Sequence, residues 1–312
     1  MSASHPVVSV VIPTHNRIEK LVRLINSVKS NTYNEIEIIV IDDVSTDGTY
    51  ETVKKKFPTV KIIRNERNRL VSGCRNIGMK ASLGELIFVL DDDNVLDKKC
   101  VEHLVDVFVS HSDVCVAAPL MYYFNAPDVI WCAGIKRNMA TSRTLTLGNG
   151  EKDENQFTAI VESDDFPNAF MFRSNASKDK DIYFDEINFP FMYEESDFIS
   201  RIKDNKSKVV LVPYAKIWHD VSKDLFFLGR YNSLKAYYLA RNRILFHKKY
   251  ACKKEFMIFK NVFLPLFSIT YLILVMQHWS VRGKYLTCMK VSNSYIKGIV
   301  DGLTLARNNI AK

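Results

Sequence analysis

The stretch ELIFVLDDDN, residues 85–94, joins an apolar run to three consecutive aspartates. The run is apolar at almost every position, which is typical of a strand buried on both faces of a sheet. Each carboxylate at the end of this strand makes ionisation of its neighbours more costly. A cluster of this kind needs a partner that offsets its charge.

Three other short runs have a similar apolar character. Helix-period segments lie between and after them. Strands that alternate with helices predict an α/β domain with a mostly parallel sheet and flanking helices. In such sheets, ligands bind beyond the carboxyl ends of the strands. The three runs are VVSVVI (7–12), IEIIVI (36–41) and VKII (60–63).

Polar turns follow three of these strands: PTHN (13–16), DDVSTDGT (42–49) and DDDN (91–94). We expect all three on one rim of the sheet. The middle turn suits the polar edge of a base or a ribose. Its hydroxyls could also begin the next helix as caps. We predict that some residues of this turn contact the nucleotide and that others cap the helix.

The triple aspartate is best explained by a divalent cation. Mg²⁺ and Mn²⁺ take carboxylate oxygens together with substrate phosphates. A bland acidic turn would explain one aspartate, and proton transfer would need fewer than three. Alternate side chains of an extended segment share a face, so we expect Asp91 and Asp93 to point together and Asp92 away. The predicted partner is a metal diphosphate.

Four motifs together resemble family 2 glycosyltransferases, the inverting enzymes of GT-A fold, from about Val7 to His219. The motifs are VVSVVIPTHNR, IIVIDDVSTDGT, SGCRNIGMKASLGELIFVLDDDN and FMYEESDFISRI. The resemblance implies a nucleoside diphosphate sugar donor and a divalent cation, Mn²⁺ or Mg²⁺. It places the cation on Asp91 and Asp93, with His219 as a further ligand of the metal or the diphosphate.

The expected nucleotide-sugar contacts follow the same resemblance, and Asp43 is the expected base contact. For Arg75, a structural salt bridge is an open alternative. Val44 stands where many family members have a small or polar residue, so we expect a local change of backbone. The contacts are Pro13, Thr14, Asn16, Asp42, Asp43, Arg75, Asp91 and Asp92.

Three carboxylates begin the helix-like segment EESDFISRI (194–202). Inverting transfer needs one carboxylate to accept the proton of the acceptor hydroxyl as its oxygen attacks the anomeric carbon. The resemblance gives this role to Glu195, ahead of Asp197 and then Glu194. Acidic residues are also favoured in a first helical turn by the helix dipole. We expect at least one of the three to do only that.

Charge divides the chain near residue 200. Residues 1–200 carry a net charge of −8, and residues 201–312 carry +16. We predict a GT-A catalytic domain over 1–222, with a nucleotide-sugar half (about 1–118) and an acceptor half (about 119–222). A helical region is predicted to follow, over 223–312.

The helical region contains an apolar segment, about 256–280. Its uncharged run, VFLPLFSITYLILVM (262–276), has 15 residues, whereas a straight membrane span needs about 20. We therefore predict an interfacial or re-entrant helix, with a buried core helix as the alternative. The N-terminal stretch shows no secretory signal, so we expect a cytoplasmic protein associated with the cytosolic face of a membrane.

These patterns predict inverting transfer of a hexose or deoxyhexose to a glycan, lipid-linked or polysaccharide. RNRILF (241–246) resembles sequences in rhamnosyltransferase-like members. One alternative is a nucleotidyltransferase acting on a sugar phosphate, which should have a glycine-rich basic loop after the first strand. Another is a basic membrane- or nucleic-acid-binding protein without catalysis. The apolar run that interrupts the basic tail argues against nucleic acid.

Overall fold

The computed structural model describes residues 5–221, 232–280 and 282–308. The chain forms two compact units. The α/β unit comprises Met1–Lys136, Thr146–Glu186 and Glu194–Val221. The helical unit comprises Arg137–Leu145, Ile187–Tyr193 and Ser222–Lys312. Two segments of the sequence-assigned acceptor half therefore belong to the helical unit.

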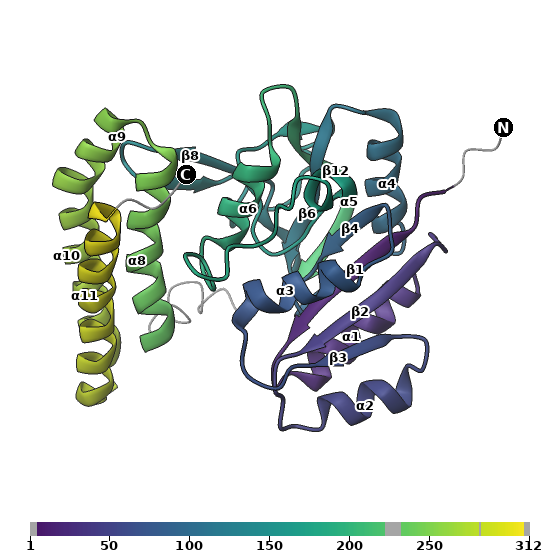
Figure 1. The fold of residues 1–312 in the computed structure, drawn as a ribbon, viewed down its shortest axis with the longest axis horizontal. Helices are drawn as coiled ribbons and strands as arrows, with labels where there is room; N and C mark the ends of the chain where they lie inside the picture. Colours follow the sequence, from purple (N-terminus) through teal and green to yellow (C-terminus); the bar gives the residue numbers. More distant parts are fainter. Residues whose placement is uncertain (1–4, 222–231, 281, 309–312) are drawn as a thin grey trace. The chain divides into compact units, whose positions relative to one another are not determined.

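Four strands near the N-terminus form the parallel part of the central sheet, in the order β4-β1-β2-β3 (Figure 1). In the register, Thr14 is paired with Asp42, and Asp42 with Arg64. Parallel strands in register bring their carboxyl ends to one edge, so the turns that follow them meet there. The strands are β1 (Val8–Thr14), β2 (Ile36–Asp42), β3 (Lys61–Arg64) and β4 (Leu86–Val89).

The sheet continues beyond β4 in the order β4-β11-β6-β12-β10. Strand β11 runs antiparallel to both of its neighbours, and β12 runs parallel to β6. The short β5 pairs with β12 and sets Asn94 opposite His219. This register brings His219 beside the acidic turn after β4. The strands are β5 (Asn94–Leu96), β6 (Val114–Tyr123), β10 (Val161–Glu162), β11 (Phe170–Arg173) and β12 (Lys208–His219).

Strand β7 (Ala126–Cys132) pairs with β6, and β8 (Ile135–Asn138) pairs with β9 (Arg143–Thr146) in a separate two-stranded sheet. Helices flank the central sheet. The predicted α/β class with flanking helices is confirmed. The helices of this part are α1 (Ile18–Lys29), α2 (Thr49–Lys56), α3 (Leu70–Ala81), α4 (Cys100–Ser110), α5 (Ser174–Lys178) and α6 (Glu194–Ile202).

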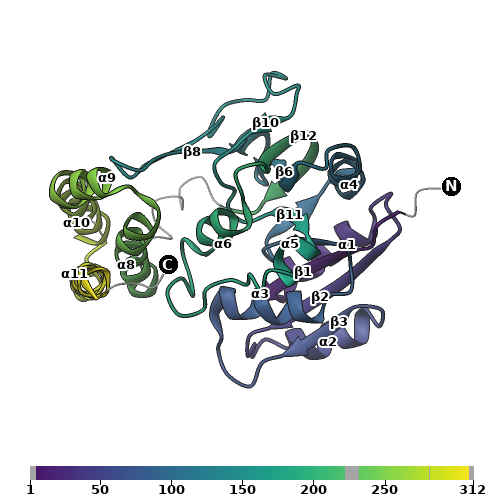
Figure 2. The ribbon, with the colours of Figure 1, turned by 45° about the horizontal axis from the view of Figure 1, so that its top comes forward.

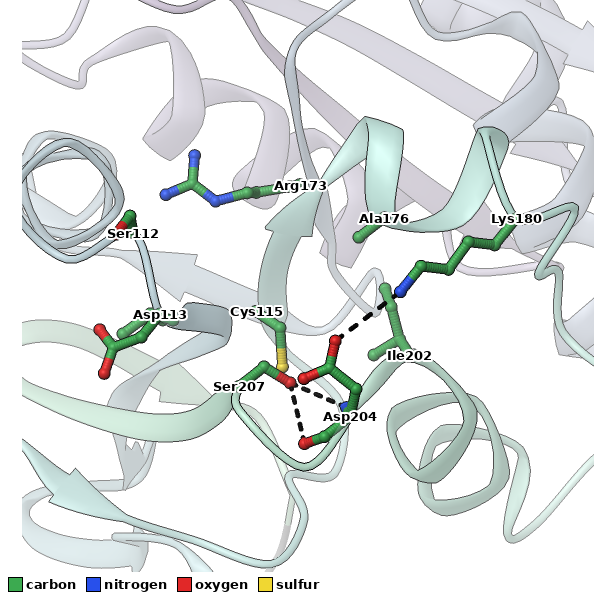
Figure 3. A pocket seen from close by; sticks show the side chains of 10 residues that line it. Ser112, Asp113, Cys115, Arg173, Ala176, Lys180, Ile202, Asp204 and Ser207 are labelled. Atoms are coloured by element: carbon green, nitrogen blue, oxygen red, sulfur yellow. Dashed lines mark hydrogen bonds and ion pairs between the residues drawn. The ribbon is translucent and has the colours of Figure 1, made fainter.

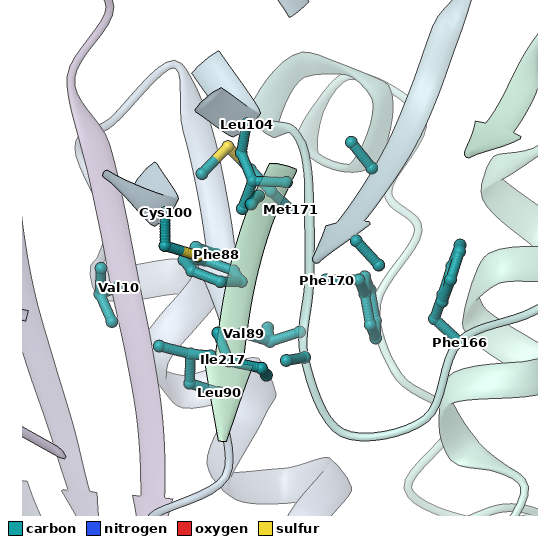
Figure 4. Packing of buried hydrophobic residues seen from close by; sticks show 14 of the residues in the cluster. Val10, Phe88, Val89, Leu90, Cys100, Leu104, Phe166, Phe170, Met171 and Ile217 are labelled. Atoms are coloured by element: carbon teal, nitrogen blue, oxygen red, sulfur yellow. The ribbon is translucent and has the colours of Figure 1, made fainter. Parts of the chain in front are cut away.

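One apolar core fills the α/β unit. Val10 of β1, Phe88 of β4, Leu104 of α4 and Met171 of β11 are completely buried and meet in it (Figure 4). Full burial of one such side chain contributes about 1.5–3 kcal/mol. The core therefore fixes the strands whose ends carry the polar turns.

Helix α3 packs directly on β1 because Gly78 has no side chain. A Cβ atom at this position would lie 2.2 Å from Cγ1 of Val11. Any larger residue would push the helix away from the sheet. The close packing holds Arg75, one turn earlier on the same helix, in the protein interior.

The helical unit contains α8 (Ser233–Tyr250), α9 (Lys253–Ile258), a π-helix η2 (Phe259–Phe263), α10 (Leu264–Ser280) and α11 (Tyr285–Arg307). Figures 1 and 2 show α8 beside α11. The helical region predicted over 223–312 is helical from Ser233 onward, and 222–231 lie outside the described residues. The π-helix precedes Pro265, whose ring would clash with the carbonyl four residues earlier in a regular α-helix.

The predicted apolar segment is helical. Lys253–Trp279, 27 residues whose most apolar 18-residue window has a mean hydropathy of 1.9, is the single helix among the described residues that is long and apolar enough to cross a membrane. Only 17% of its most apolar window is buried within the structure. Exposed residues at helical spacing form one stripe along it: Val262, Leu266, Ile269, Ile273 and Met276.

Candidate active site

The turns after β1, β2 and β4 share hydrogen bonds, which confirms the predicted rim. The Thr14 hydroxyl donates to Asp92 at 2.7 Å. The Asn16 N–H donates to Ser45 Oγ at 2.9 Å, and the Thr46 N–H donates to Asn16 Oδ1 at 2.7 Å. The first turn thereby connects the other two.

The three aspartates after β4 point differently from the prediction. Asp91 accepts a hydrogen bond from Arg75 at 2.8 Å, whereas Asp92 and Asp93 share Arg17 at 3.0 and 3.1 Å. The expectation that Asp91 and Asp93 would point together is wrong. Strand β4 ends at Val89 and the chain then turns, so the alternation of an extended strand does not apply.

Arg17 is a site residue that the sequence reasoning missed. Its side chain is 50% exposed and bridges Asp92 and Asp93. Lys20, one turn further along α1, lies 4.0 Å from Asp93. Burial raises the pKa of Asp92 to about 6, although Arg17 opposes the rise. The basic residue directly after PTHN was the available signal.

Asp93 forms a close pair with His219, whose Nε2 lies 3.1 Å from Asp93 Oδ1. Burial opposes ionisation of Asp93, but His219, Arg17 and Lys20 together lower its pKa to about 2. The pair therefore offers one carboxylate oxygen and one imidazole side by side, both acceptable to Mn²⁺. Within the described residues, no three His, Cys, Asp or Glu side chains gather to hold a metal ion. The predicted third ligand, Asp91, is bound to Arg75.

Arg75 is completely buried and contacts three carboxylates. Its guanidinium lies 2.8 Å from Asp91, 2.9 Å from Glu195 and 3.4 Å from Glu194. These contacts match the salt-bridge alternative for Arg75. One buried cation thus connects the acidic turn after β4 to the carboxylates at the start of α6.

Glu195 is the most accessible of the three candidate bases. Its side chain is 16% exposed, against 6% for Glu194 and none for Asp197. Asp197 forms an ion pair with Arg201 at 2.8 Å. Burial raises the pKa of both Glu194 and Glu195, and Arg75 opposes the rise. A raised carboxyl pKa suits a general base that works near neutral pH.

Asn168 connects the acidic turn to Glu195. Its side chain exchanges hydrogen bonds with Asn94 at 2.7 and 2.9 Å and accepts one from the Asp91 N–H at 3.3 Å. Its own N–H donates to Glu195 at 3.2 Å. Asn168 has φ 72°, a conformation that asparagine tolerates better than most residues. The residue pattern around Asn168 does not predict this role.

The carboxylate of Asp43, the expected base contact, is occupied by hydrogen bonds from the protein itself. It accepts hydrogen bonds from Asn65 and the Arg69 N–H, each at 2.8 Å, and from the Leu70 N–H at 3.1 Å. Asp43 therefore anchors the start of α3. Val44 beside it has φ 63°, which is unusual for a β-branched residue and agrees with the expected change of backbone.

Asp42 is completely buried and accepts a hydrogen bond from the Ser45 N–H at 2.9 Å. Pro13 is the penultimate residue of β1 and is half-buried. Asn16, at the exposed end of the first turn, has φ 53°. Pro13, Asn16 and Asp42 therefore lie along the same rim, as predicted.

A pocket of about 160 Å³ lies elsewhere in the α/β unit (Figure 3). It is lined by Asp113, Arg173 and Asp204, among others, near the beginning of β6 and the end of α6. It shares no residue with the site described above. This pocket is therefore separate from the predicted site of sugar transfer.

The family model described as glycosyl transferase family 2 matches residues 9–179. Among similar proteins, TarP of Staphylococcus aureus, a poly(ribitol-phosphate) beta-N-acetylglucosaminyltransferase, is 39% identical over 102 residues, 31% of each chain. GlyG of Streptococcus pneumoniae, a glycosyltransferase, is 28% identical over 124 residues, 39% of this chain and 41% of that one. The matches span less than half the length of these relatives.

Two solved structures have a similar fold. TarS residues 1–349 of S. aureus in complex with UDP gives a TM-score of 0.53 at 19% identity, covering 94% of this chain and 92% of that one. GalNAc-T7 with UDP, GalNAc and Mn²⁺ gives 0.59 at 18% identity, covering 86% and 58%. At these identities the likeness establishes the fold.

Proposed function

Because the chain belongs to glycosyl transferase family 2, we propose that it transfers a sugar from a nucleoside diphosphate sugar to a hydroxyl group, with inversion at the anomeric carbon. One observation carries this proposal. A partly exposed carboxylate, Glu195, is connected by the buried Arg75 to the acidic turn at the carboxyl ends of the strands. The proposed base and the proposed donor site thus belong to one network of ion pairs.

The donor site we propose lies on the rim formed by the three turns. The diphosphate of the donor would face the acidic turn. Cations are needed there, because the diphosphate and the carboxylates repel each other. Arg17 and Lys20 are accessible enough to pair with phosphate oxygens, since their side chains are 50% and 34% exposed. Asp93 and His219 would hold Mn²⁺ or Mg²⁺. A bound divalent ion offsets the charge that develops on a departing diphosphate.

Glu195 is the proposed general base. It takes the proton of the acceptor hydroxyl while the hydroxyl oxygen forms its bond to the anomeric carbon. The bond from that carbon to the diphosphate breaks on the opposite face, and its electron pair leaves with the diphosphate. Arg75 and the Asn168 N–H both donate to Glu195 Oε1, which fixes the orientation of the carboxylate.

For the acceptor, we propose a lipid-linked or polysaccharide glycan, reached at the cytosolic face of a membrane. The exposed apolar stripe from Val262 to Met276 supports contact with lipid. The +16 net charge of residues 201–312 supports attraction to anionic headgroups. The transferred sugar is proposed to be a hexose, an N-acetylhexosamine or a deoxyhexose such as rhamnose. The family assignment favours this reaction over nucleotidyl transfer.

The test is a thermal-shift screen of UDP, GDP and dTDP and their sugars, with and without Mn²⁺. A ligand at about 100 times its Kd stabilises the folded state by about 2.7 kcal/mol, which raises the Tm by about 5–10 °C in a domain of this size. We expect one base to stabilise the protein only when Mn²⁺ is present. The matching sugar nucleotides are then assayed for release of the diphosphate. No stabilisation by any nucleotide would refute the proposal.

A further inference from the structure

Trp131 of β7 carries a buried polar group that lacks a partner. The residue is 9% exposed, and its indole Nε1–H has no hydrogen-bond acceptor among the described residues. An indole nitrogen can only donate. Most buried donors in proteins are paired with another protein group or with bound water, and an unpaired one is costly. This nitrogen therefore needs an acceptor that binds beside it.

A β-bulge sets the position of Trp131. Trp131 is the extra residue of β7 at the point where its pairing with β6 shifts by one residue. Bulges redirect a side chain and are frequent beside active sites. The bulge thus gives the indole a direction that a regular strand would not. The pairs on its two sides are Met121 with Cys132 and Tyr122 with Ile130.

The indole ring meets the ring of His219 within the α/β unit. The two ring centroids lie 4.4 Å apart, with the planes at 78°. His219 Nε2 pairs with Asp93 Oδ1 at 3.1 Å. The other ring nitrogen of His219, Nδ1, is buried and also lacks a partner in the part of the chain that the structure describes. Two rings in contact therefore each present one unpaired nitrogen, next to the proposed metal and diphosphate site.

The two nitrogens together favour a hydroxyl group as their ligand. A carboxylate oxygen only accepts, so the pair with Asp93 places the proton of a neutral His219 ring on Nε2 and leaves Nδ1 as an acceptor. A hydroxyl can donate to Nδ1 and accept from Trp131, whereas an ionised phosphate oxygen can only accept. Where Nε2 binds a cation, Nδ1 carries the proton instead, and the two lone pairs of a hydroxyl oxygen can accept from both rings. A hydroxyl fits either state.

We propose that Trp131 Nε1 and His219 Nδ1 form a subsite for a carbohydrate hydroxyl, of the donor's sugar or of the acceptor glycan. The inference rests on the proposed function and deepens it, because it assigns residues to the sugar and not only to the diphosphate. Both nitrogens are covered by protein atoms, and the Asn149 amide holds the Trp131 carbonyl at 2.7 Å. The hydroxyl therefore enters as the two rings separate, while the backbone of Trp131 stays in place.

The test follows the indole N–H signals of the full-length protein, labelled with ¹⁵N in its three tryptophans. Mg²⁺ is present in place of Mn²⁺, because paramagnetic Mn²⁺ would broaden the signals. UDP, GDP and dTDP are compared with UDP-N-acetylglucosamine, UDP-glucose, GDP-mannose and dTDP-rhamnose. Free N-acetylglucosamine, glucose, mannose and rhamnose are titrated separately. Trp218→Phe and Trp279→Phe assign the signals, and that of Trp131 follows by elimination.

We expect the Trp131 signal to respond to a sugar. A shift with a sugar nucleotide that exceeds the shift with its nucleoside diphosphate places the hydroxyl on the donor, and a shift with a free sugar places it on the acceptor. The Trp218 signal should stay, because its Nε1 already donates to the Pro127 carbonyl at 3.2 Å. An equal shift with the nucleoside diphosphate alone would assign the nitrogen to phosphate. That result, or no shift of Trp131 with any ligand, overturns the proposal.

Trp131→Phe keeps an aromatic ring and removes the N–H. It should weaken binding of the ligand that shifts the signal by about 2–10-fold, the effect of one neutral hydrogen bond, and leave the Kd of the nucleoside diphosphate unchanged. Trp218→Phe is the matched control, since the same substitution in the same unit should alter neither Kd. Calorimetric titration measures both. Equal sugar affinity in wild type and Trp131→Phe would also overturn the subsite.

The free sugars separate this inference from the proposed reaction. Should no nucleotide and no sugar nucleotide bind, the proposed donor fails and the free sugars alone decide. A shift of the Trp131 signal with one of them would then support the subsite, and an unchanged signal would overturn it. If a sugar nucleotide binds and the Trp131 signal stays in place with every ligand, the subsite fails and the proposed donor stands.

Discussion

Two groups of carboxylates in the α/β unit are neutralised in different ways. In the acidic turn, Asp92 and Asp93 face Arg17, whose side chain is 50% exposed. At the start of α6, Glu194 and Glu195 face Arg75, whose side chain is completely buried. A guanidinium group therefore neutralises carboxylates in both groups, but it is partly exposed in the acidic turn and completely buried at the start of α6.

The difference indicates which group can change partners. The Arg17 side chain reaches solvent, although the side chains of Asp92 and Asp93 are only 5% and 12% exposed, so a ligand or a metal can replace this cation more readily than one that is completely buried. A buried pair cannot be opened without leaving an uncompensated charge in the interior. We therefore interpret the acidic turn as the exchangeable half of the site, and the α6 carboxylates as its fixed half.

The largest effect is expected for Arg75→Gln. Removing one partner of a buried ion pair costs about 3–5 kcal/mol, and here three carboxylates lose their common cation. Urea unfolding measures the loss. Arg75→Lys keeps the charge but not the forked geometry, so it should fall between wild type and Arg75→Gln. A loss below about 1 kcal/mol for Arg75→Gln would remove the distinction between the two groups.

Glu195→Gln should leave the fold and UDP binding intact and reduce turnover by about 10²–10⁴-fold, the usual contribution of a general base. The amide keeps the size of the side chain but cannot accept the proton. Steady-state release of the nucleoside diphosphate measures turnover. Glu51→Gln, at an exposed position, serves as the matched substitution. Full turnover in Glu195→Gln would exclude it as the base.

Much of the α/β unit could be predicted from local patterns. Apolar runs gave the strands, and the rule for carboxyl ends of parallel strands gave the rim that Thr14, Asn16 and Asp92 share. These features depend on residues adjacent in sequence. The direction of each aspartate did not follow, because the strand ends before Asp91 and the turn is fixed by contacts with distant residues.

The remaining contacts join residues far apart in sequence. Asn168 meets Asn94, and Arg75 meets Glu195 across 120 positions. Asn168 lies just before β11, so its contact with Asn94 depends on the register of β11 between β4 and β6, which no periodicity reveals. Likewise, 187–193 belong to the helical unit, in which Asn242 of α8 donates to the carbonyls of Phe191 and Met192. One sequence contains no signal for the direction of such side chains.

Asp93→Ala tests the exchangeable half. Asp93 pairs with His219 at 3.1 Å, so its loss should weaken Mn²⁺ binding by at least about 10–100-fold, the effect reported for residues that support metal ligands. The Mn²⁺ dependence of stabilisation by UDP should disappear in the thermal-shift assay. Asp113→Ala, at an exposed ion pair with Lys208, is the control. Unaltered Mn²⁺ dependence in Asp93→Ala would place the metal elsewhere.

The smallest change in stability is expected for Arg17→Gln, which repeats the Arg75→Gln substitution in the exchangeable half. Because the Arg17 side chain is half-exposed, whereas its two carboxylates are nearly buried, the free energy of unfolding should fall, but by less than the loss of about 3–5 kcal/mol expected for Arg75→Gln. Binding should respond more than folding does: without Arg17, UDP should bind more weakly, and the loss should shrink as salt rises, because salt screens exposed charges. Urea unfolding and calorimetric titration with UDP at two salt concentrations measure both effects. If Arg17→Gln destabilised the protein as much as Arg75→Gln, the acidic turn would be as fixed as the α6 carboxylates, and a diphosphate could not displace its cation.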